Sequence, residues 1–185
     1  AGLAVPVPGV RSEVGPIPHH ETIEKAIALG DLDDVKRQVA VHPERLQDGS
    51  HPSLTPLHQA VLRKKTEIAC WLVEAGADVD RTDGSARTTL HLAVERGDPA
   101  VIAVLLEHEA KPNQLDKVGW SPLHHAAAGN KLDVARALLA GGADPMARSE
   151  RGGTPLHEAA ASGGADLIRL LLESGTDPAA TADSG

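Results

Sequence analysis

The chain of 185 residues carries 18 lysine and arginine residues against 26 aspartate and glutamate residues, a net charge of −8. This acidic balance, with two Trp and no Phe or Tyr, argues against nucleic-acid binding, which favours basic surfaces and stacking aromatic rings. A single cysteine excludes an internal disulfide and a cysteine-rich zinc site, and no apolar run approaches the roughly 18–20 residues that cross a bilayer. We therefore expect a soluble protein with no nucleic-acid partner and no membrane partner.

Both ends of the chain differ in composition from its middle. Residues 1–20 contain four prolines, and proline removes backbone donors and favours extended geometry. We predict that residues 1–20 form an extended N-terminal segment, which serves as a linker or lies as a strap on the first ordered unit. Residues 181–185 are small and polar, and we predict that this C-terminus frays.

Between the two ends, one short motif recurs four times. TPLHQA, TTLHLA, SPLHHA and TPLHEA begin at residues 55, 88, 121 and 154, a constant spacing of 33 residues. Apolar runs typical of helices follow at residues 68–73, 101–106, 134–139 and 167–172. A divergent unit fits the same template from Glu21. We predict five repeats within residues 21–180, which start near residues 21, 50, 83, 116 and 149.

The chemistry of the motif explains its residues one by one. Its Thr or Ser is an N-cap residue, whose hydroxyl accepts amide hydrogens at the start of a helix. Proline at the next position, as in Pro56, has no N–H. An N–H at the first helical position has no partner within the helix, so its absence costs no hydrogen bond. The Leu and Ala that follow point to the core. No single repeat carries enough apolar residues to fold alone, so neighbouring repeats must stack.

In motif and period, residues 21–180 resemble ankyrin-repeat proteins. The departures are Thr89 in place of the proline, Lys64 in place of the glycine between the helices, and Glu109 in place of the glycine after the second helix. The resemblance implies an all-α fold, a solenoid of helix-turn-helix units joined by hairpin fingers. It also implies protein binding through a concave surface, made by the fingers and the exposed side of each first helix.

The register of the repeats predicts which residues lie on that binding surface. Tryptophan and arginine dominate the energetics of protein interfaces, so Arg87, Arg96 and Trp120 are the expected anchors. The alternative for Trp120 is that it only covers the neighbouring finger. The full set of predicted partner-binding residues is Leu54, Leu62, Arg63, Arg87, Glu95, Arg96, Lys117, Val118, Trp120 and Arg151.

Neither a metal site nor a catalytic site is expected. The four motif histidines belong to repeats about 8–10 Å apart, too far for two of them to share an ion. The resemblance gives them a structural role instead, hydrogen bonding to the threonine and to a neighbouring repeat. No phosphate-binding loop occurs, Asp33 and Asp34 are interpreted as a solvated helix face, and nothing marks Cys70 as a nucleophile. We therefore predict no catalytic residue, no metal and no cofactor.

Two residues occupy positions at which asparaginyl hydroxylases modify ankyrin proteins. They are Asp80 and Asn113, and the sequence leaves open whether either is hydroxylated or simply closes a turn.

The predicted function is that of a non-catalytic protein-interaction module or scaffold, intracellular and cytoplasmic, with the nucleus as the alternative compartment. The alternative function is a regulatory ankyrin segment of a larger multidomain protein, which could be an enzyme. An unrecognised enzyme is the third alternative, and no converging acid, base or nucleophile supports it.

Two further expectations concern the partner. Basic residues gather in the second to fourth repeats, so we expect an acidic segment of the partner to dock there. The fifth repeat keeps Leu167, Leu170 and Leu171, and we expect these to form an exposed apolar edge, used for further repeats or for self-association.

Overall fold

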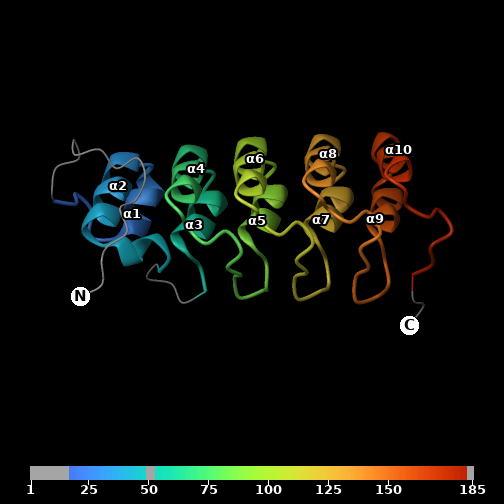
Figure 1. Cartoon of the computed structure of the whole chain (residues 1–185), viewed down its shortest axis with the longest axis horizontal. Coiled ribbons are helices and arrows are strands. Elements are labelled where there is room, and N and C mark those ends of the chain that lie inside the picture. Colours follow the sequence, from blue (N-terminus) through green and yellow to red (C-terminus); the bar gives the residue numbers. More distant parts are fainter. Residues whose placement is uncertain (1–16, 49–52, 183–185) are drawn as a thin grey trace.

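The computed structural model describes residues 17–48 and 53–182. In these ranges ten α-helices form five consecutive pairs that stand side by side in a row (Figure 1). The helices are α1 (Ile23–Leu29), α2 (Leu32–Val41), α3 (Pro56–Leu62), α4 (Thr66–Glu74), α5 (Thr89–Arg96), α6 (Pro99–Glu107), α7 (Pro122–Ala128), α8 (Leu132–Ala140), α9 (Pro155–Ser162) and α10 (Ala165–Glu173), with a short 3₁₀ helix, η1 (Pro43–Leu46), after α2.

The row has two layers of helices. Odd-numbered helices contact one another from α1 to α9, and even-numbered helices do the same from α2 to α10. The loops that lead into α5, α7 and α9 project as fingers on the side of the odd-numbered layer (Figure 1). The described residues contain no strand, only an isolated bridge between Thr82 and Thr88. The predicted all-α solenoid is therefore confirmed.

The repeated motif starts four of the odd-numbered helices in the same way. At α3, the amide of His58 donates to the Thr55 hydroxyl (3.2 Å), and the amide of Thr55 donates to Nδ1 of His58 (3.2 Å). The same reciprocal cap occurs at the N-termini of α5, α7 and α9. Each cap satisfies amide groups that a helix start leaves without intrahelical partners.

The core is aliphatic and runs through the row between the two layers. The motif leucines Leu57, Leu90 and Leu123 are fully buried, and Leu105 of α6 is fully buried among them. The motif alanines of α3, α5, α7 and α9 are also fully buried, and their small side chains let neighbouring helices approach closely.

Two of the motif histidines, His91 and His124, join their repeat to the next. Because Nδ1 of His91 accepts the Thr88 amide (3.1 Å), its Nε2 carries the proton and donates to the carbonyl of Trp120 (3.1 Å). His124 does the same with the carbonyl of Gly153 (3.1 Å). The structural role that the resemblance implies is therefore present at both histidines.

A second set of side chains links successive loops. The Asn113 amide group donates to the carbonyl of Gly142 (3.1 Å), and its oxygen accepts the amide of Asp144 (2.7 Å). Asp80 accepts the amide of Lys111 (3.0 Å). Asp80 and Asn113 thus connect neighbouring repeats, and whether either is hydroxylated stays untested.

At the N-terminal end, the prediction of a solvated Asp34 is wrong. Its carboxylate is fully buried and accepts the backbone amides of His19 and His20. Gln38 is buried beside it and donates to the His20 carbonyl (2.8 Å). Burial raises the pKa of Asp34, but the hydrogen bonds from His19, Gln38 and His20 outweigh this effect and lower it. The remainder of the predicted N-terminal segment, residues 1–16, lies outside the described residues.

At the C-terminal end, the predicted apolar edge is largely wrong. Leu167 and Leu171 are fully buried and belong to the hydrophobic core. Leu170 is half-buried, and Leu172 is 40% exposed. Further repeats or self-association at this edge stay predictions, and Leu172 is the leucine of α10 that remains exposed.

Core packing in α6 gives a first test. We expect Leu105→Ala to lower the free energy of unfolding by about 2–5 kcal/mol, because it removes a fully buried side chain from between repeats. The exposed Arg136 of α8 provides the control, and Arg136→Ala should change it by less than about 0.5 kcal/mol. Urea melts of the two variants measure both values, and comparable losses would contradict this assignment of helix faces.

The buried histidines predict a pH dependence of stability. Burial lowers the pKa of His58, His91 and His124 below the ordinary imidazole value, so the unfolded chain takes up protons that the folded chain resists. Their contribution to stability is therefore full above the ordinary pKa and is lost as the pH falls below it. We expect urea melts to show lower stability at about pH 5.5 than at about pH 7.5.

A matched pair of variants isolates this effect. His124→Gln should reduce the loss of stability between the two pH values, whereas His108→Gln, at an exposed position, should leave the loss unchanged. If the unmodified chain and both variants lost the same stability between the two pH values, the buried histidines would not be the source of the pH dependence.

Candidate functional site

The finger surface comprises residues 53–55 before α3, the loops that lead into α5, α7 and α9, and the exposed side chains of these four helices. The predicted partner-binding residues differ in exposure. Arg63, Glu95, Arg96, Lys117, Val118 and Arg151 are exposed, whereas Leu54, Leu62, Arg87 and Trp120 are half-buried. Two subsets are brought together, one around Arg87 and Glu95, the other around Val118, Trp120 and Arg151.

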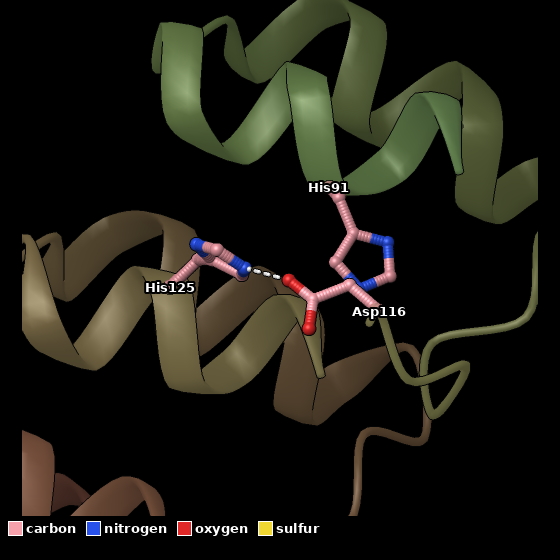
Figure 2. A group of neighbouring side chains, drawn as sticks. All are labelled: His91, Asp116 and His125. Atoms are coloured by element: carbon pink, nitrogen blue, oxygen red, sulfur yellow. Dashed lines mark hydrogen bonds and ion pairs between the residues drawn. The ribbon is translucent and has the colours of Figure 1, made fainter. Parts of the chain in front are cut away.

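A group of three titratable side chains lies where α5 meets α7. His91, Asp116 and His125 place one nitrogen or oxygen atom each within 4.8 Å of one another (Figure 2). Both ring nitrogens of His91 are already engaged, Nδ1 with Thr88 and Nε2 with the Trp120 carbonyl. Only two side chains remain as potential ligands, fewer than the three or four of protein zinc sites. Hydrogen bonding within the fold explains this cluster, and the absence of a metal stays a prediction.

Arg87 is held by two carboxylates. Its Nη2 lies 2.8 Å from Oδ2 of Asp83, and its Nη1 lies 3.2 Å from both carboxylate oxygens of Glu95. Burial raises the pKa of Asp83, but the hydrogen bonds and the charge of Arg87 outweigh it and lower that pKa. Since Arg87 fills these contacts within the chain, much of its charge is neutralised before any partner arrives.

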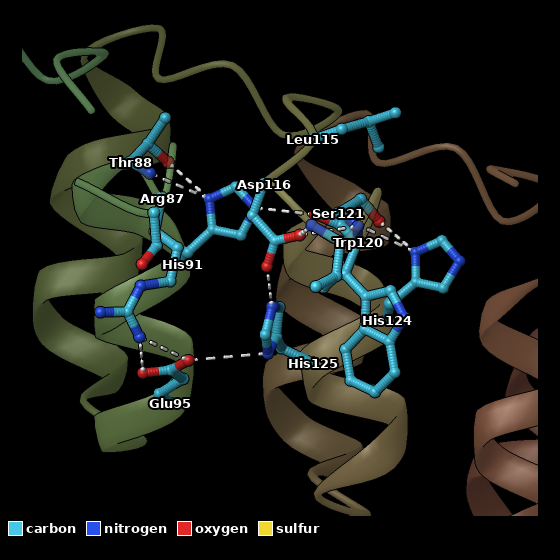
Figure 3. Close-up of polar contacts among 12 residues, drawn as sticks. Arg87, Thr88, His91, Glu95, Leu115, Asp116, Trp120, Ser121, His124 and His125 are labelled. Atoms are coloured by element: carbon cyan, nitrogen blue, oxygen red, sulfur yellow. Dashed lines mark hydrogen bonds and ion pairs between the residues drawn. The ribbon is translucent and has the colours of Figure 1, made fainter. Parts of the chain in front are cut away.

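The same network continues across the next repeat to Trp120 (Figure 3). Glu95 lies 3.7 Å from Nδ1 of His125, and Nε2 of His125 lies 2.9 Å from Oδ2 of Asp116. The other oxygen of Asp116 accepts the amides of Trp120 (2.9 Å) and Val118 (3.0 Å). Burial raises the pKa of Asp116, but these hydrogen bonds outweigh it and lower that pKa.

The indole of Trp120 is positioned by two histidine rings. It stacks on His124 at 6.2 Å between centroids and meets His125 edge-on at 5.0 Å. Sequence reasoning missed Asp83, Asp116 and His125 as parts of this surface. A signal was present, because an acidic residue stands four positions before both Arg87 and Trp120.

A groove of about 540 Å³ opens beside Trp120, between the finger that leads into α7 and the finger that leads into α9. We call it the Gly153 groove, and it is lined by Val118, Trp120, Ser149, Glu150, Arg151, Gly153, His157, Glu158 and Ala182. Three of the predicted residues, Val118, Trp120 and Arg151, therefore meet at one concave site. The contribution of Glu158 was not predicted.

Comparison with known proteins gives one positive result. A search of curated proteins finds no match to the chain. None of the helices in the described parts of the chain has the length and apolar character needed to span a membrane. The family model for ankyrin repeats, which represents three copies of the repeat, matches residues 23–116 and 90–182. The match does not fix the number of repeats, so five stays a prediction, but it spans most of the sequence. The chain therefore belongs to the ankyrin-repeat family.

Proposed function

We propose that this protein is a non-catalytic recognition module or scaffold that binds a partner protein through its finger surface. Ankyrin repeats are generally protein-interaction modules, and the family is typically non-catalytic. The observation that carries the proposal is the apolar pair at the rim of the Gly153 groove. There Val118 is 59% exposed at a finger tip, beside the half-buried Trp120. Tryptophan is enriched among the residues that carry most of the energy of protein interfaces, and the exposed Val118 extends the apolar surface beside it.

The binding surface is arranged before a partner arrives. The Trp120 backbone is held on both sides, by Asp116 at its amide and by His91 at its carbonyl. Its ring is packed on His124 and His125. Since little of this surface must be ordered on association, most of its contact energy is available for affinity.

The proposal includes an acidic segment of the partner, docked on the second to fourth helix pairs. Arg96 and Lys117 are exposed and form no ion pair within the described residues, and Arg63 contacts only the neutral Gln59 side chain (3.2 Å). These three cations, rather than Arg87, are the candidates to meet carboxylates. The expected intracellular, cytoplasmic location also belongs to this proposal.

Affinity capture followed by measurement of the dissociation constant tests the surface. We expect Trp120→Ala to weaken binding of the captured partner by about tenfold or more, as removal of an interface anchor does. Arg136→Ala, at an exposed position on α8, is the control and should bind like the unmodified chain. Full affinity in Trp120→Ala would exclude Trp120 as an anchor. Because Arg87 pairs with the buried Asp83, its replacement would also disturb the fold and is a poorer probe.

Salt dependence tests the acidic segment separately. We expect the association rate to fall as salt is added, because screening weakens attraction between Arg63, Arg96, Lys117 and the partner's carboxylates. A variant with Arg96 and Lys117 changed to Gln should associate more slowly and show a weaker salt dependence. A rate that is independent of salt, or a basic partner segment at these residues, would refute this part of the proposal.

A further inference from the structure

The Gly153 groove exists because one repeat lacks a side chain that its neighbours have. The residue before the motif is Arg87 in the third helix pair, Trp120 in the fourth and Gly153 in the fifth. Arg87 extends across its repeat to Asp83 and Glu95, and the Trp120 ring packs on its own helix. At Gly153 no side chain fills the equivalent space, and its volume of about 540 Å³ lies within the usual range of ligand pockets.

The groove also contains a carboxylate without an internal partner. Glu158 lies 33 positions after His125, which pairs with Asp116. The residue equivalent to Asp116 is Ser149, whose hydroxyl accepts the Gly153 amide (3.1 Å). Among the described residues, half-buried Glu158 forms no hydrogen bond and no ion pair through its side chain. A carboxylate removed in part from water is stabilised by a cation that supplies its missing hydrogen bonds.

A side chain at position 153 would lie beside the carboxylate of Glu158. A β-carbon built on Gly153 would lie 3.7 Å from Oε1 of Glu158. The carboxylates of Glu150 and Glu158 outnumber the single cation of the lining, Arg151. The indole of Trp120 forms another wall, and aromatic rings attract cations over their faces.

We propose that the Gly153 groove receives an arginine side chain of the partner protein. Its guanidinium pairs with the Glu158 carboxylate, and its alkyl stem and planar head lie along Val118 and Trp120. Arginine fits better than lysine, because its planar fork bonds a carboxylate with two N–H groups and stacks on an aromatic ring. The arginine would occupy the space that Arg87 fills from within the chain two repeats earlier. This inference rests on the proposed function, since it names one residue of the partner.

The first experiment supplies the arginine from within the chain. Gly153 does not adopt a positive φ, so Gly153→Arg requires no strained backbone. Its β-carbon would lie 3.2 Å from Oγ of Ser149, so this hydroxyl has to shift by a few tenths of an ångström to admit the side chain. We expect this variant to raise the thermal midpoint of unfolding by about 2 °C or more, and to lose that gain when combined with Glu158→Gln. Gly153→Gln is the uncharged control, and its effect on the thermal midpoint should be the same with and without Glu158→Gln. An equal effect of Gly153→Arg with and without Glu158 would overturn the pairing.

The second experiment uses random linear peptides displayed on phage and selected on the full chain. We expect the selected peptides to share an arginine whose change to lysine weakens binding. Glu158→Gln should lower their affinity at least about tenfold, and Gly153→Arg should abolish binding by filling the groove. Glu173→Gln, the same charge change at an exposed site on α10, should have no effect.

The outcomes separate this inference from the proposed function. Peptides that lose affinity in Trp120→Ala but bind Glu158→Gln and Gly153→Arg normally would overturn the arginine and leave the binding surface intact. Selected peptides that carry an aliphatic or acidic residue in place of the arginine, and that are insensitive to Glu158→Gln, would do the same. Failure to select any peptide that depends on Trp120 would count against both.

Discussion

The hydrogen bonds of His91 and His124 set the geometry of the row from α5 to α9. At His91, one ring nitrogen accepts the Thr88 amide and so completes the cap of α5, while the other donates to the Trp120 carbonyl in the next finger. One buried ring thus fixes where a helix begins and where the following finger lies. A buried polar group left without its partner costs about 1–3 kcal/mol, so helix starts and finger positions are coupled through these rings. The position of Trp120, on which the candidate site depends, is a consequence of this link.

The same link explains how much the sequence could predict. The spacing of 33 residues and the capping chemistry of Thr55 or Ser121 are local properties, and they are sufficient to place the odd-numbered helices and the core leucines. The register also indicates which residues face the fingers. It contains no information about contacts between different repeats, such as that of Glu95 with His125, because these depend on side-chain directions in both.

The two errors at the ends of the row have a common physical origin. Repeat periodicity predicts what a residue faces only when it has a neighbour on both sides. The sequence predicts Asp34 on a solvated helix face, yet the backbone amides of His19 and His20 donate to its buried carboxylate. The sequence predicts Leu167 and Leu171 at an open edge because their repeat is the fifth, yet both are fully buried in the core. For residues of the terminal repeats, periodicity alone therefore does not predict which side chains are buried.

The fingers share one backbone conformation and differ in their side chains. Their turns also differ in how many hydrogen bonds hold them. Asp83 accepts the amides of Ser85 and Arg87, and Asp116 accepts those of Val118 and Trp120, so each carboxylate closes its finger with two hydrogen bonds.

In the next finger, Ser149 takes the place of this aspartate and accepts only the Gly153 amide through its side chain. A hydroxyl is also a weaker acceptor than a carboxylate, so this turn is held less firmly. Of these three fingers, the one with the fewest side-chain hydrogen bonds to its own backbone borders the Gly153 groove, and the finger on the opposite wall, which carries Trp120, has two such bonds. The ordering cost of binding in the groove is therefore confined to the single turn at Ser149 and is small.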